Sequence, residues 1–224
     1  MRKRFDRARY GPGWFEVIFG AILSVILGVV LAVGYFVFRP VTKVKELPKE
    51  PIPGTVYYIE GSRDYSNARR LIAKQKFFIR GGSVVVNEDE LNTAANPVAT
   101  PTPPGTPEPA APTTLLSAGS PNFRIYEGLM QISVPVRIKY DTFAVDQTVL
   151  VQATGTFVKQ ADGFVFSPKT VYVGSCPMEK IPRAVDYIMK KFYATQPVPP
   201  DIATSWSKLS DVTIEGSTLR LTMP

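Results

Sequence analysis

Residues 130–140, MQISVPVRIKY, alternate between apolar and polar positions, with Pro135 standing among the polar set. A period of two predicts a long β-strand with one buried side and one solvent-facing side. Proline has no backbone N–H to donate to a neighbouring strand, so Pro135 indicates a sheet edge or a bulge. This strand predicts that the rest of the chain builds an antiparallel sheet around it.

The sequence after this strand continues the β pattern and then adds helices. Residues 149–159 and 164–173 are two further predicted strands, joined by a tight turn around Ala161-Asp162-Gly163. A helix is expected over 177–192, because its apolar residues recur at helical spacing. A short helix at 203–209 and a hairpin at 212–223 end the chain.

The sequence before the strand supplies smaller elements. We expect a strand at 55–60, a helix at 64–76 and a strand at 83–86, followed by a helix capped by Asn87. Three acidic residues open this last helix: Glu88, Asp89 and Glu90. They could hold a metal ion, but capping and the positive end of the helix dipole explain them more simply. No metal site is therefore predicted.

Two proline-rich stretches divide the chain. Residues 39–54 form an extended spacer, and residues 92–121 form a Pro/Thr/Ala-rich insertion that we expect to be disordered. The piece 55–91 is too small to fold alone, so 55–224 is predicted to be one domain containing that insertion. The expected fold class is α+β: one N-terminal transmembrane helix, then an antiparallel sheet of about six strands with helices on one face.

The N-terminal region predicts a membrane anchor. Residues 14–38 form an apolar run with aromatic residues at both ends, and its uncharged portion is long enough to cross a bilayer. A basic cytoplasmic tail at 1–13 would place 39–224 outside, at the bacterial inner (cytoplasmic) membrane. A cleaved signal peptide would have a shorter apolar region, so an uncleaved signal anchor is favoured. The positive residues that set this orientation are Arg2, Lys3, Arg4, Arg7 and Arg9.

A ribbon of small residues runs along the apolar segment. Gly20, Ser24, Gly28 and Ala32 recur every fourth residue and share one helix face. Small side chains let two membrane helices approach closely, so the ribbon predicts helix–helix packing with a second helix or a homodimer. The alternative is chance, because glycine and alanine are common in membrane helices.

Residues that could support catalysis are sparse. The chain has no histidine and one cysteine, Cys176, which precedes the helix predicted over 177–192 and is expected to be a buried thiol. Ser205 and Lys208 fit S-x-x-K, without the partner motifs of serine–lysine hydrolases. No phosphate loop, dinucleotide fingerprint or metal-spaced cluster occurs, and the basic residues outside the tail are too dispersed for a nucleic-acid surface.

The chain resembles the signal-anchored bacterial envelope proteins of the YpmS type. The resemblance lies in the basic tail and anchor, the acidic motif Glu88-Asp89-Glu90-Leu91-Asn92, and the ending DVTIEGSTLRLTMP. The proline-rich insertion departs from that pattern. The resemblance implies an envelope location and no assigned activity.

We therefore expect a non-enzymatic, membrane-tethered extracytoplasmic binding or scaffold module without a cofactor. Its expected partners are the lipid bilayer and an envelope protein or helix. The alternative is a lipid-binding or lipid-transfer module, with an apolar groove between the sheet and the helix at 177–192. A hydrolase that uses Ser205 or Cys176 is the third hypothesis.

Overall fold

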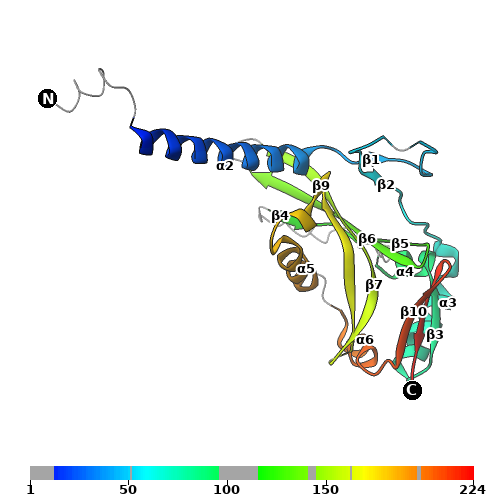
Figure 1. The fold of residues 1–224 in the computed structure, drawn as a ribbon. Coiled ribbons are helices and arrows are strands. Elements are labelled where there is room, and N and C mark those ends of the chain that lie inside the picture. The colour runs from blue at the N-terminus through cyan, green and yellow to red at the C-terminus, as the bar shows by residue number, and fades with distance from the viewer. Residues whose placement is uncertain (1–12, 51, 96–115, 141–144, 162, 196–197) are drawn as a thin grey trace, which may run out of the picture.

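The computed structural model describes residues 13–50, 52–95, 116–140, 145–161, 163–195 and 198–224 (Figure 1). Its first element is the apolar helix α2, Trp14–Phe38. This helix is long and apolar enough to cross a membrane, and none of its most apolar window is buried within the chain. The tail with Arg2, Lys3, Arg4, Arg7 and Arg9 lies outside the described residues.

The main sheet has six strands around the long strand predicted from the 130–140 pattern. Its order is β4-β6-β7-β8-β9, with β5 pairing β6 beside β4, and all pairs are antiparallel. The strands are β4 Leu116–Ala118, β5 Asn122–Tyr126, β6 Leu129–Tyr140, β7 Val145–Gln160, β8 Gly163–Val173 and β9 Cys176–Pro177.

Pro135 lies in an interior strand, which corrects the expectation of an edge or a bulge. On one side it is opposite Leu150 of β7, and on the other side its carbonyl accepts the N–H of Gly119 at 2.7 Å. Gly119 belongs to the connection between β4 and β5, which both pair with β6. The missing N–H of proline is tolerated because the neighbouring strand is itself interrupted at this point.

The C-terminal hairpin belongs to a second sheet, so the strands do not form the single sheet that we expected. Strands β10 (Asp211–Glu215) and β11 (Thr218–Thr222) pair with each other, and β11 pairs with β3, Val84–Asn87. Two short strands, β1 (Thr42–Lys43) and β2 (Tyr57–Tyr58), form a separate parallel pair. The α+β class with antiparallel sheets is confirmed.

Four further helices and two 3-10 turns connect these strands in the described part of the chain. A 3-10 turn η1 (Tyr65–Asn67) leads into α3 (Ala68–Ile79), and α4 (Glu88–Ala95) follows β3 directly. After β9 come the 3-10 turn η3 (Met178–Lys180), α5 (Ala184–Thr195) and α6 (Pro200–Trp206).

The helix predicted over 177–192 begins later than expected. Pro177 still belongs to β9, and the regular helix starts at Ala184. Pro182 lacks an N–H, and Arg183 has a φ of +62°, which is outside the right-handed helical region. These two residues set the delayed start.

The predicted disordered insertion at 92–121 is wrong at both ends. Asn92 is fully buried in α4, which continues to Ala95. At the other end, β4 begins at Leu116 and β5 at Asn122. The central part, 96–115, lies outside the described residues.

One core cluster joins the two larger sheets. It contains Met130 and Ile132 of β6, Val171 of β8, and Leu219 and Leu221 of β11. The inner side chains of α5 and the last turns of α2 pack against the same cluster. The apolar helix is therefore part of the folded domain at its C-terminal end only.

Candidate functional site

The end of α2 is fixed to the turn between β8 and β9. The N–H of Ser175 donates to the carbonyl oxygen of Phe36 at 3.0 Å, and Ser175 Oγ donates to that of Arg39 at 3.3 Å. Gly174 has a φ of +58°, and a Cβ there would lie 2.0 Å from the carbonyl oxygen of Val37. Glycine is required at this turn by both its conformation and the close approach of the helix.

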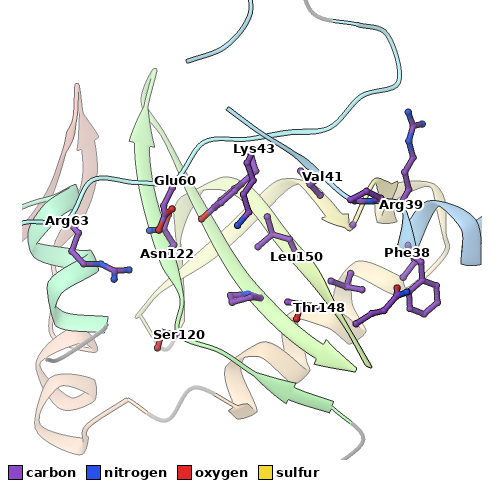
Figure 2. Close-up of a pocket in the computed structure, with 17 residues that line it drawn as sticks. Phe38, Arg39, Val41, Lys43, Glu60, Arg63, Ser120, Asn122, Thr148 and Leu150 are labelled. Atoms are coloured by element: carbon purple, nitrogen blue, oxygen red, sulfur yellow. The ribbon is translucent and has the colours of Figure 1, made fainter. Parts of the chain in front are cut away.

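A cleft of about 730 Å³ lies next to this junction (Figure 2). One end is formed by Val37 and Phe38, the last residues of α2, and by the start of the linker. The strand pair β1–β2 crosses above it, held by hydrogen bonds such as the N–H of Val44 to the carbonyl of Tyr58 at 3.0 Å. Leu150 of β7 lies on the sheet side of the cleft. The linker, the helix end and the sheet thus enclose one space.

The charged side chains of the cleft are mainly cationic. Arg39, Lys43 and Arg63 line it together with a single carboxylate, Glu60, which leaves a net formal charge of +2. In Figure 2 the Lys43 side chain points from the linker toward the sheet, whereas the Arg39 guanidinium is turned away from it. The ion pairs Lys74–Glu90, Arg137–Asp146 and Arg220–Glu215 lie elsewhere in the chain.

Hydrogen-bonding side chains form and stabilise the wall of the cleft that lies opposite the end of α2. Asn122 Oδ1 accepts the N–H of Gly61 at 2.8 Å, which fastens the segment after β2 to β5. Tyr58 is 6% exposed, and burial, assisted by the Glu60 charge, raises its pKa to about 12. The phenol is therefore neutral at ordinary pH and remains a hydrogen-bond donor.

The acidic motif that begins α4 serves the fold. Glu88 accepts the N–H of Ser62 at 2.6 Å and that of Ile125 at 2.7 Å through its two carboxylate oxygens. Glu90 accepts the N–H of Asn87 at 3.0 Å, which is the glutamate half of the expected capping box, and pairs with Lys74 at 2.7 Å. Both carboxylates are occupied by protein donors. Among the described residues no group of three or more potential metal ligands is found.

Asn92 ends the same motif and was not expected to have this role. It is fully buried, donates to the carbonyls of Ser62 and Phe123 at 2.8 and 2.7 Å, and accepts the N–H of Phe123 at 2.6 Å. One amide thus joins α4, β5 and the segment that precedes α3. Glu88 and Asn92 of the motif bind the backbone of Ser62. Because Gly61 and Ser62 directly follow the cleft residue Glu60, the motif stabilises this wall of the cleft.

The two candidate nucleophiles, Cys176 and Ser205, are buried within the fold. Cys176 is a free, buried thiol, as expected, and burial, with the nearby Glu179 charge, raises its pKa. A raised pKa keeps the thiol protonated and so disfavours the reactive thiolate. Ser205 is 4% exposed, and its hydroxyl lies 3.1 Å from the carbonyl of Asp201, whereas Lys208 is exposed. The structure does not bring these residues together with the cleft.

The space between α5 and the main sheet is nearly filled. Ile188 and Met189 pack over Ile132, Val151 and Ala153, and leave a cavity of about 10 Å³. That is room for roughly one water molecule. An acyl chain in the groove that the alternative hypothesis requires would have to displace α5.

The small-residue ribbon on α2 meets no other part of the described chain. A Cβ added at Gly20 or Gly28 would have nothing within 4 Å outside the helix itself. The Ser24 hydroxyl donates to the carbonyl of Gly20 at 2.8 Å, within the helix. Packing through Gly20, Ser24, Gly28 and Ala32 remains a prediction about a partner helix.

No pattern in the sequence points to the cleft. Lys43 and Glu60 are remote in sequence and occur in unremarkable surroundings, the first in a predicted spacer and the second at the end of a predicted strand. Only the β1–β2 pairing brings them to the same space. Comparison of the chain with protein-family models, with curated proteins and with solved structures gives no match.

Proposed function

We propose that this chain is a non-enzymatic, membrane-tethered binding module of the bacterial envelope, which holds its cleft beside the outer face of the cytoplasmic membrane. The apolar helix α2 is the tether, and the basic tail with Arg2, Lys3, Arg4, Arg7 and Arg9 keeps its N-terminus inside. The folded domain then lies outside the cytoplasm. A scaffold role for an envelope protein belongs to the same proposal.

The observation that supports this function best is the contact between the end of α2 and the β8–β9 turn. Large apolar side chains of the helix remain exposed, for example Val25 at 66% and Leu31 at 64%, which an apolar bilayer would cover. Its last turns, with Val33 and Val37, instead pack on the core of the domain. A helix joined in this way holds the domain in a fixed orientation, so the cleft keeps one position relative to the membrane.

The topology is tested with two variants, each carrying one added cysteine, in intact spheroplasts. A Ser217→Cys variant places a thiol in the exposed β10–β11 turn, and we expect a membrane-impermeant maleimide to label it before lysis. An Ala8→Cys variant places the thiol in the tail, and labelling is expected only after lysis. Native Cys176 is buried and provides a low background. Labelling of Ala8→Cys before lysis would refute the proposed orientation.

The binding role is tested by photo-crosslinking in intact membranes. A photoreactive amino acid replaces Val41, which lines the cleft, and in a control variant it replaces Lys169, an exposed residue of β8. A discrete adduct is expected from the cleft position and is not expected from the control. Identical adduct patterns, or none from either position, would contradict a binding role for the cleft.

A further inference from the structure

The cleft begins where the apolar helix ends, and this position restricts what can occupy it. Val37 and Phe38 are at once the last residues of α2 and part of the cleft lining. If α2 is the membrane tether, these residues lie at the level of the lipid headgroups, because the apolar run stops there. A molecule whose apolar part lies beside α2 therefore has its polar part at the mouth of the cleft.

The side chains that line the cleft suit a phosphate group. Lys43 is the cation that points toward the sheet within the cleft, and an ammonium group is a usual protein partner of phosphate oxygens. Arg63 adds a second positive charge at the wall opposite Phe38, where its guanidinium also donates to the Tyr65 hydroxyl at 3.2 Å. The hydroxyls of Ser120 and Thr148 add neutral donors, and Leu150 adds apolar surface. Net positive charge and apolar surface together match an amphiphile with an anionic headgroup.

We propose that the cleft binds the phosphate headgroup of an anionic phospholipid whose acyl chains remain in the bilayer beside α2. The inference rests on the proposed function in one respect, that α2 is the membrane tether. It adds a ligand class to the cleft, at a place different from the groove between α5 and the sheet.

Glu60 provides a second test of the proposal, because it is the one carboxylate among the residues that line the cleft. Its negative charge opposes a phosphate and partly offsets the cations. Replacing it by Gln keeps the size of the side chain and removes that repulsion. The Glu60→Gln variant should therefore bind the anionic lipid more tightly than the natural chain.

Native mass spectrometry of the full chain, released from detergent micelles, tests the proposal with defined lipids. The chain is titrated with dioleoylphosphatidylglycerol and, separately, with dioleoylphosphatidylcholine. We expect retention of one phosphatidylglycerol molecule in preference to phosphatidylcholine. Lys43→Gln should weaken this binding by about fivefold, the size expected for one solvent-exposed charge contact.

Lys49→Gln is the matched control. Lys49 is an exposed residue of the same linker, carries the same charge and does not line the cleft. If Lys49→Gln binds phosphatidylglycerol as tightly as the natural chain does, the result supports a specific site. Equal weakening by Lys43→Gln and Lys49→Gln would mean general attraction between a basic linker and anionic lipid, and would overturn the proposal. Tighter binding by Glu60→Gln supports it, and weaker binding counts against it.

A soluble competitor identifies the source of the phosphate. Glycerol 3-phosphate should fail to displace the lipid at equal concentration, because it lacks the acyl chains. Displacement at equal concentration would show a site for a soluble phosphate ester and would overturn the lipid assignment. If the chain does not prefer phosphatidylglycerol over phosphatidylcholine while Ser217→Cys and Ala8→Cys are labelled as expected, only the lipid inference is refuted. If the labelling of the two cysteines is reversed, the proposed membrane orientation, on which the inference rests, is refuted.

Discussion

Replacing Gly174 by Ala should release the end of α2 from the folded domain. The new Cβ would lie 2.0 Å from the carbonyl oxygen of Val37 and 3.2 Å from that of Phe36, so the helix end and the turn must separate. Both neighbours are backbone atoms, and no side-chain rotation can relieve the contact. The variant also places an alanine at a φ of +58°, a left-handed conformation that costs about 1 kcal/mol.

The expected magnitude follows from the contacts that are lost. The hydrogen bond from Ser175 to Phe36 contributes about 1 kcal/mol. The partly buried Val33 and Val37 lose core packing worth about 1 kcal/mol between them, as a fraction of the value for full burial. Together these contacts favour the docked helix end by about 2 kcal/mol in the natural chain, and a clash that prevents them removes that preference, which is roughly a 30-fold change in the docking equilibrium.

Hydrogen exchange of the full chain in detergent micelles measures this change. Peptides that cover 171–178 report on the Ser175 amide, and their exchange should accelerate in Gly174→Ala. Gly216→Ala is the matched control, because Gly216 has a φ of +59° and nothing within 4 Å of an added Cβ. Peptides from 129–140 should keep their protection in both variants, which shows that the sheet remains folded. Equal exchange at 171–178 in the two variants would show that the added Cβ does not separate the turn from the helix end.

Three further changes have defined outcomes. Asn92→Leu leaves buried backbone groups without partners and should lower the unfolding free energy by about 3 kcal/mol; thermal unfolding tests this, and an unchanged melting temperature would contradict it. Burial raises the pKa of Tyr58 to about 12 in the folded state, so protonated Tyr58 stabilises the fold below pH 10, the usual tyrosine pKa, and this contribution is lost as the pH rises from 10 to 12. Alkaline unfolding of Tyr58→Phe should show a shallower decline over that range, and identical curves would exclude this cause. Gly28→Ile should weaken any association through the small-residue ribbon, and a membrane two-helix reporter assay with unchanged signal would remove that prediction.

The local elements of this protein follow from short-range sequence patterns. The helix Trp14–Phe38 has the predicted bounds, because an uninterrupted apolar run is a local property. The alternation in 130–140 predicts the strand β6, although its polar residues Gln131 and Ser133 are buried and not solvent-facing. The Asn87–Glu90 spacing predicts the contact between Glu90 and the Asn87 N–H. The hairpin around Gly216 follows from its turn residues and the alternation on either side.

Which strands pair with one another was decided by tertiary structure. The C-terminal hairpin pairs with β3, more than a hundred residues earlier in the chain, and no local pattern specifies that choice. The sequence places Asn92 in a disordered insertion because the prolines after it dominate the composition, yet its amide satisfies three backbone groups from other segments. Long-range hydrogen bonds of this kind leave no periodic signal in the sequence.

The apolar helix, the α+β class and the positions of most strands follow from the amino-acid pattern, since each depends on residues close together in the chain. Only the tertiary structure placed Gly174 against the end of α2 and brought Lys43, Glu60 and Arg63 to one cleft. A cleft is the space left between packed segments. Its shape depends on how the linker, the helix end and the sheet meet, which is set by contacts distant in sequence.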